Sequence, residues 1–197
     1  MLNHRPAAQS LAATIRTLGD DQLTLATPCP AYRVGDLVDH IGGLALAFTS
    51  AARKVDLAGS AIPPLGNAAN LEDGWRARIA HDLDELATAW QDPTAYVGHT
   101  RAGGVDLDGP TAGTVALSEL VLHGWDLAQA IGHPYAVEAD AVEACHGFFS
   151  MFSGPGTEEL RGDAFGPVIA VDAQAPALDR LLGLSGRDPA WRSVQTV

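Results

Sequence analysis

Positive charge is scarce in this sequence. It contains one lysine, Lys54, and its arginines stand singly, so the formal net charge is −12 at pH 7. Proteins that bind nucleic acid present clustered lysine and arginine to the phosphates, and anionic membrane surfaces attract the same kind of cluster. The composition therefore argues against both nucleic acid and a membrane as the binding partner.

Long apolar runs and paired cysteines are also missing. No apolar run reaches the length of a transmembrane helix, and the first twenty residues mix apolar positions with Gln, Ser, Thr and Arg, unlike the core of a signal peptide. The two cysteines, Cys29 and Cys145, form no CxxC pair and indicate no disulfide framework. We expect a cytoplasmic protein in which Cys29 is structural.

The common catalytic motifs are absent as well. The sequence has no GxSxG elbow, no GxxxxGK phosphate loop, no strand–glycine–helix dinucleotide signature and no HExxH. A function must therefore be sought in residues that helical spacing brings together.

Helical periodicity dominates what is present. The 197 residues are 47% hydrophobic, enough for one compact domain over 1–197. Apolar residues recur every three to four positions, which predicts helices. We expect these helices from just after Pro6 to Leu18, Val34 to Lys54, Trp75 to Trp90, just after Pro110 to about Gly132 and about 137–152, with a short one at 177–184. We expect a loop at 59–70 and two extended pieces within 95–109, around Gly103 and Gly104. The predicted fold class is all-α, a four-helix bundle over roughly 1–152 with a C-terminal appendage over roughly 153–197.

The fourth predicted helix carries polar residues on an apolar background. Glu119 and His123 are four positions apart and Asp126 falls in the same narrow sector. Because apolar residues surround them, we expect this helix to be buried. Buried ionic groups need partners, and a metal ion is one such partner.

A third candidate ligand lies on the second predicted helix. His40 shares the apolar stripe of Leu37 and Leu44, where a histidine is out of place. Two imidazoles and a carboxylate leave coordination positions open for water or substrate. The set suits zinc, or ferrous iron in a facial arrangement, and the spacing does not choose between them. Asp126 either accepts a hydrogen bond from a ligand histidine or forms a salt bridge with an arginine.

Three segments carry a resemblance to a known family. TPCPAYRVGDLVDHIGG (27–43) resembles the opening of the mycothiol-dependent maleylpyruvate isomerase metal-binding domain, in which the final histidine is a ligand. SELVLHGWDLAQAIG (118–132) resembles the later motif, whose Glu and His complete the triad. The tail at 165–191 resembles the ending of an uncharacterised actinobacterial branch of this group.

The resemblance implies a DinB-like four-helix bundle that holds a divalent metal, commonly zinc, through His40, Glu119 and His123. It also implies that the metal activates a low-molecular-weight thiol, mycothiol or a relative, for transfer or isomerisation. A metal-bound thiol loses its proton and becomes a nucleophile at neutral pH. The sequence shows no arginine cluster that would hold a dicarboxylate substrate.

Three hypotheses follow for the function. The first is a metal-dependent S-transferase or isomerase whose partners are a small thiol and an electrophile. The second is a non-catalytic metal-binding bundle with a binding or stress-related role. In the third, the triad is only a buried hydrogen-bond network. The sequence leaves a homodimer open as the oligomeric state.

Overall fold

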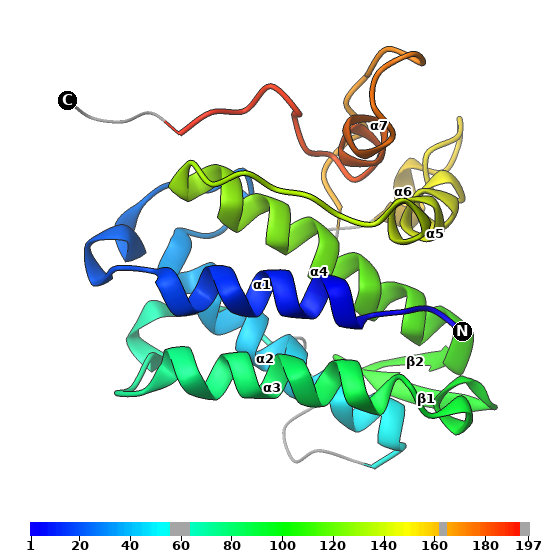
Figure 1. Cartoon of the computed structure of the whole chain (residues 1–197). Coiled ribbons are helices and arrows are strands. Elements are labelled where there is room, and N and C mark those ends of the chain that lie inside the picture. Colours follow the sequence, from blue (N-terminus) through cyan, green and yellow to red (C-terminus); the bar gives the residue numbers. More distant parts are fainter. Residues whose placement is uncertain (56–63, 162–164, 194–197) are drawn as a thin grey trace.

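The protein is mostly helical, with one small two-stranded sheet (Figure 1). The computed structural model describes residues 1–55, 64–161 and 165–193. Its α-helices are α1 (Arg5–Thr17), α2 (Val34–Arg53), α3 (Trp75–Ala89), α4 (Gly109–Ile131), α5 (Ala139–Ser150), α6 (Glu158–Arg161) and α7 (Ala177–Leu184). Short 3-10 helices are η1 (Asp20–Thr24), η2 (Ala68–Asn70) and η3 (Pro93–Tyr96).

The first four α-helices share one hydrophobic core. α1 and α2 each pack against both α3 and α4, and Figure 1 shows the four running side by side. Leu11, Leu37, Ile79 and Leu117, one from each helix, are almost completely buried. Their burial follows from the spacing of three to four residues that the sequence shows along each helix.

Helix α4 is buried on nearly every side because it packs between two groups of elements. α1 and α2 cover one side of it, and α5 covers another. Asp108 begins the helix by accepting a hydrogen bond from the Thr111 backbone N–H at 2.7 Å. Gly132, at φ 70°, ends it in the left-handed conformation that glycine adopts freely. The sequence predicted a start just after Pro110, whereas α4 begins at Gly109. Pro110 therefore sits in the first turn, where a missing N–H costs nothing.

A β-hairpin connects η3 to α4. Strands β1 (His99–Ala102) and β2 (Val105–Asp108) pair antiparallel, with His99 opposite Asp108. Gly103 and Gly104 both have positive φ, as a two-residue hairpin turn with the twist of the strands requires. The two extended pieces expected around these glycines are therefore the arms of one hairpin.

The C-terminal part packs onto the outside of α5. α5 packs against α4, and α7 packs against α5. Phe148, Phe149 and Phe165 join α5 to the chain before α7, and the Arg161 guanidinium donates to the carbonyl oxygen of Leu184 at 2.9 Å. α7 has the bounds that the sequence predicted, whereas the sequence did not predict the single turn α6.

Two further expectations concern the loop at 59–70 and membrane-spanning helices. Part of the loop expected at 59–70 lies outside the described residues, and η2 forms at its end. Among the described residues, no helix combines the length and apolar character needed to cross a bilayer.

Candidate metal centre

His40 is held on α2 by the chain that passes over it. Asp36, one turn earlier, accepts a hydrogen bond from the Ala68 backbone N–H at 2.9 Å, which fixes this loop against α2. The Pro64 carbonyl oxygen then lies 2.6 Å from Nδ1 of His40. A carbonyl only accepts, so Nδ1 carries the hydrogen and Nε2 keeps a lone pair. The contact with Pro64 therefore occupies Nδ1 and leaves Nε2 of His40, the potential ligand atom, directed away from the loop.

His123, on α4, lies between two carboxylates. Its Nε2 is 3.0 Å from Oε2 of Glu119, and its Nδ1 is 3.0 Å from Oδ2 of Asp126. The His123 side chain is almost fully buried, whereas 28% of the Glu119 side chain is exposed. The spacing of three and four residues along one helix produces both contacts, as the sequence predicted.

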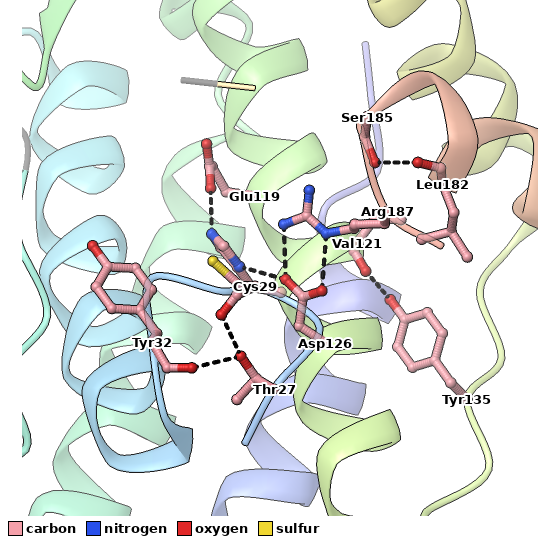
Figure 2. Close-up of polar contacts among 11 residues, drawn as sticks. Thr27, Cys29, Tyr32, Glu119, Val121, Asp126, Tyr135, Leu182, Ser185 and Arg187 are labelled. Carbon is pink, nitrogen blue, oxygen red and sulfur yellow. Dashed lines mark hydrogen bonds and ion pairs between the residues drawn. The ribbon is translucent and has the colours of Figure 1, made fainter. Parts of the chain in front are cut away.

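Asp126 has a second partner that comes from the C-terminal part of the chain. Arg187, just after α7, donates from Nε to Oδ1 at 2.9 Å and from Nη2 to Oδ2 at 2.7 Å. Figure 2 shows this two-point contact beside Glu119 and Cys29. The sequence left Asp126 with two alternative partners, a histidine and an arginine, and the structure places it in contact with both.

Burial and charge shift the pKa values of these groups in opposite directions. Burial lowers the pKa of His123, but the hydrogen bonds and charges of Asp126 and Glu119 outweigh it and raise that pKa to about 9. Burial also raises the pKa of Asp126, but Arg187 and His123 hold it below its usual value. The His40 pKa is lowered by burial and by the neighbouring positive charge on His123. Without a cation, His123 is thus an imidazolium that donates to both carboxylates.

The predicted triad comes together in the fold. His40, Glu119 and His123 each offer one ligand atom, and these atoms lie within 4.8 Å of one another. The rings of His40 and His123 meet edge to face, with centroids 5.1 Å apart. Nδ1 of each imidazole is fixed by an acceptor, the Pro64 carbonyl for His40 and the Asp126 carboxylate for His123. This is the usual arrangement around metal-binding histidines. The donor set therefore fits a divalent cation, which would replace the Nε2 proton of His123.

Cys29 and Tyr32 lie close to this site, in the loop between η1 and α2 (Figure 2). The hydroxyl of Thr27 lies 2.8 Å from the carbonyl oxygens of both residues and fixes the loop. The Tyr32 ring lies 5.0 Å from the ring of His40. Burial, together with the carboxylate of Asp126, raises the pKa of the Cys29 thiol, so it stays protonated and agrees with the structural role expected for it.

Sequence reasoning missed one residue of the site, Arg187. It follows Gly186 beyond a short helix, and no local spacing marks it as a partner of Asp126. The only signal was that it lies within the tail that resembles the actinobacterial branch. Its role depends on a contact across the fold, which periodicity does not report.

The fold and the site define a class: a mostly helical protein with a partly buried His–Glu–His cluster, in which one histidine is oriented by an aspartate. The family comparison is more specific. Residues 4–128 match the model of the mycothiol maleylpyruvate isomerase N-terminal domain, and the chain belongs to this family. A DinB-like fold is consistent with this membership. Neither the curated proteins nor the solved structures gave a significant match.

Proposed function

We propose that the protein is a DinB-like four-helix bundle that binds a divalent metal, zinc first among the candidates, through His40, Glu119 and His123. We further propose that it transfers a small thiol, mycothiol or a relative, to an electrophile. The observation that carries the proposal is that Nδ1 of His40 and Nδ1 of His123 are already bound, to Pro64 and Asp126 respectively. This arrangement leaves Nε2 of both imidazoles beside the Glu119 carboxylate.

A divalent cation held there would lower the pKa of a thiol that reaches it, so that the thiol reacts as a thiolate. In such a transfer the sulfur would form a bond to the electrophilic carbon, the leaving group would depart with its electron pair, and the thiol proton would pass to solvent. Within the protein, Asp126 keeps His123 in one orientation and Pro64 does the same for His40. These contacts place the three donors before the thiol arrives.

The charges around the site favour S-transfer over isomerisation of a dicarboxylate. Arg187 is the arginine in contact with Asp126, and its Nε and Nη2 are both engaged there. Only 13% of its side chain is exposed. A dicarboxylate needs free bidentate donors, and this arginine is not one.

The C-terminal part belongs to the same proposal. Because Arg187 reaches Asp126, we propose that the whole chain, 1–197, acts as a single unit around the metal. The cytoplasmic location and the homodimer remain predictions.

Metal content tests the proposal first. Protein purified without chelator or metal-affinity tag is expected to contain one divalent ion per chain. His123→Ala should lose that ion, and His133→Ala, at an exposed histidine, should keep it. A folded wild-type protein that takes up no metal would instead support the hydrogen-bond network.

Cobalt substitution then separates an enzyme from a metal binder. Mycothiol titrated into the cobalt form is expected to produce a thiolate-to-metal absorption band. If neither mycothiol nor any other small thiol perturbs the cobalt spectrum, the non-catalytic metal-binding bundle is the better description.

A further inference from the structure

His40 is the less buried of the two histidines in the candidate metal centre. It is half-buried, whereas His123 is buried. In the part of the chain that the structure describes, its hydrogen bond is the one between Nδ1 and the Pro64 carbonyl oxygen, which lie 2.6 Å apart. The outer side-chain torsion of histidine is broad, so one contact at Nδ1 lets the ring rock and carry Nε2 away from Glu119. A fixed position of Nε2 therefore needs contacts with the faces of the imidazole.

Two aromatic rings supply such contacts, and they come from different elements. The ring of His123, on α4, meets the ring of His40 at an angle of 84°. The ring of Tyr32, in the loop before α2, lies 5.0 Å from the His40 ring between centroids and is inclined to it by 35°. Aromatic rings at this separation are in contact. A rotation of the His40 imidazole out of its plane would therefore push it into the Tyr32 ring.

The backbone that carries Tyr32 is fixed at several points. The Tyr32 N–H donates to the carbonyl oxygen of Cys29 at 3.1 Å, and the Tyr32 carbonyl oxygen accepts from the Thr27 hydroxyl at 2.8 Å. At the base of the loop, the Val34 N–H donates to the carbonyl oxygen of Leu25 at 3.0 Å. The loop is thus closed by its own hydrogen bonds, and it presents the Tyr32 ring to His40 as a fixed wall.

The Tyr32 hydroxyl adds a weaker contact, to the segment of chain that also binds His40. It accepts a hydrogen bond from the Gly66 N–H at 3.5 Å, a length at which such bonds are weak. Figure 2 shows this hydroxyl directed away from Asp126 and Arg187. The main contact of Tyr32 with the site is therefore its ring.

We propose that Tyr32 is a positioning residue of the metal centre, whose ring holds the imidazole of His40 in the orientation that presents Nε2 to the other ligands. The inference rests on the proposed function and adds to it a residue that orients His40. Asp126 orients His123 through a hydrogen bond of 3.0 Å, whereas Tyr32 acts on His40 through packing. Groups that hold ligand histidines in place raise the affinity for the metal, because the donors then need no rearrangement when the ion binds.

The first test uses the metal-free protein. NMR of ¹⁵N-labelled histidine reports which ring nitrogen of His40 carries the proton, and His40→Ala assigns its signals. We expect Nδ1 to carry the proton in the wild type and in Tyr32→Phe, which keeps the ring. In Tyr32→Leu, which has no flat face, the His40 signals should move toward the average of the two tautomers. Unchanged His40 signals in Tyr32→Leu would overturn the inference.

Metal affinity gives an independent readout. Tyr32→Leu should weaken cobalt binding roughly tenfold, measured by competition with a chromophoric chelator, and Tyr32→Phe should keep the wild-type affinity. If Tyr32→Phe weakens binding as much as Tyr32→Leu, the hydroxyl rather than the ring is responsible, and the inference is overturned. Tyr32→Met, which fills the space with a flexible chain, replaces Tyr32→Leu if that variant does not fold.

Tyr96→Leu is the matched control. Tyr96 is half-buried like Tyr32, and its ring contacts Trp90 with centroids 5.3 Å apart, close to Gly113 near the start of α4. The substitution removes the same kind of aromatic contact away from the candidate ligands. It should lower the stability of the protein and leave the cobalt affinity unchanged. An equal loss of affinity in Tyr96→Leu would show that affinity merely follows stability, which would overturn the inference.

A double-mutant cycle shows whether Tyr32 acts through His40. In a His40→Ala background, Tyr32→Leu should cause no further loss of cobalt affinity, because the imidazole that Tyr32 orients is absent. The same fold-loss in both backgrounds would mean that Tyr32 supports the fold in general, and the inference would be overturned.

Cobalt uptake by the wild type separates the two proposals. Cobalt uptake together with unchanged His40 signals in Tyr32→Leu overturns the inference and leaves the proposed metal function intact. A folded wild type that takes up no cobalt overturns the metal function and, with it, the role of Tyr32 in a metal centre, even if Tyr32→Leu frees the His40 ring.

Discussion

Arg187 and Asp126 lie 61 positions apart in the sequence and meet through two hydrogen bonds, of 2.9 and 2.7 Å. The same carboxylate accepts a hydrogen bond from Nδ1 of His123. Arg187 lies outside the residues 4–128 that match the family model. The C-terminal part of this chain therefore supports the orientation of His123, a candidate metal ligand, through one buried carboxylate.

Replacing Arg187 tests this link. Arg187→Met leaves the Asp126 carboxylate, which is fully buried, without its arginine partner. Removing one partner of a buried ion pair costs about 3–5 kcal/mol because the remaining charge stays desolvated. Because His123 still donates to Asp126 in this variant, we expect a loss at the lower end of that range in urea unfolding at pH 7. Arg192→Met, at an exposed arginine of the same segment, serves as the control, and equal stability of the two variants would contradict the link.

Periodicity accounts for the parts of the fold that the sequence could predict. The bounds of α7 and the burial of Trp75 and Trp90 follow from apolar residues at helical spacing. The clustering of the triad could be predicted for a related reason, since a polar side chain on an apolar stripe stands out. His40 is the clearest case.

Contacts between distant segments account for what the sequence could not predict. The contact of Arg187 with Asp126, and that of Pro64 with His40, form only when loops fold back onto helices. Neither contact leaves a local pattern in the sequence. This is also why the two roles considered for Asp126 could not be separated before the arginine was located.

Asp126→Asn probes the orientation of His123 directly. The amide keeps the shape of the side chain but removes the charge that fixes Nδ1–H of His123. Loss of such a partner of a ligand histidine lowers metal affinity roughly 10- to 100-fold. Competition with a chromophoric chelator measures the affinity. Asp73→Asn, at an exposed aspartate just before α3, is the control. A variant that keeps wild-type affinity while folded would show that Asp126 does not act through His123.

Gly66 tests the loop that holds His40. A Cβ at this position would clash with the backbone carbonyl of Asp36 and lie 2.9 Å from the Cβ of His40. Gly66→Ala must therefore push the loop away from α2. We expect about 1–3 kcal/mol of lost stability, together with weaker metal binding, measured by urea unfolding and chelator competition.

The matched control for Gly66 is Gly147, on α5. A Cβ there meets nothing within 4 Å, and the position is exposed. Gly147→Ala should stabilise the protein by about 0.5–1 kcal/mol through helix propensity alone and leave metal affinity unchanged. Similar effects of the two substitutions would show that the loop does not constrain His40.

The dependence of stability on pH should carry a contribution from His4, at the start of α1. This side chain is 2% exposed, its Nε2 lies 2.8 Å from the carbonyl oxygen of Gly113, and its ring stacks on Trp90 with centroids 5.5 Å apart. Burial lowers its pKa in the folded state below the usual 6.5. Between the folded value and 6.5 the unfolded chain binds more protons, so stability falls as the pH falls through that window. Above pH 6.5 the contribution of neutral His4 is fully present.

His4→Gln isolates this contribution, since glutamine does not titrate and its amide is able to donate to Gly113. His40, whose pKa is also lowered by burial, is present in both proteins and cancels in the comparison. Urea unfolding from pH 7.5 to pH 5 should show the free-energy difference between wild type and variant shrinking below about pH 6.5. His133→Gln, at an exposed position, controls for the substitution itself. Parallel curves for wild type and His4→Gln would mean that His4 takes up its proton as readily in the folded protein as in the unfolded chain, against the desolvation that its burial imposes.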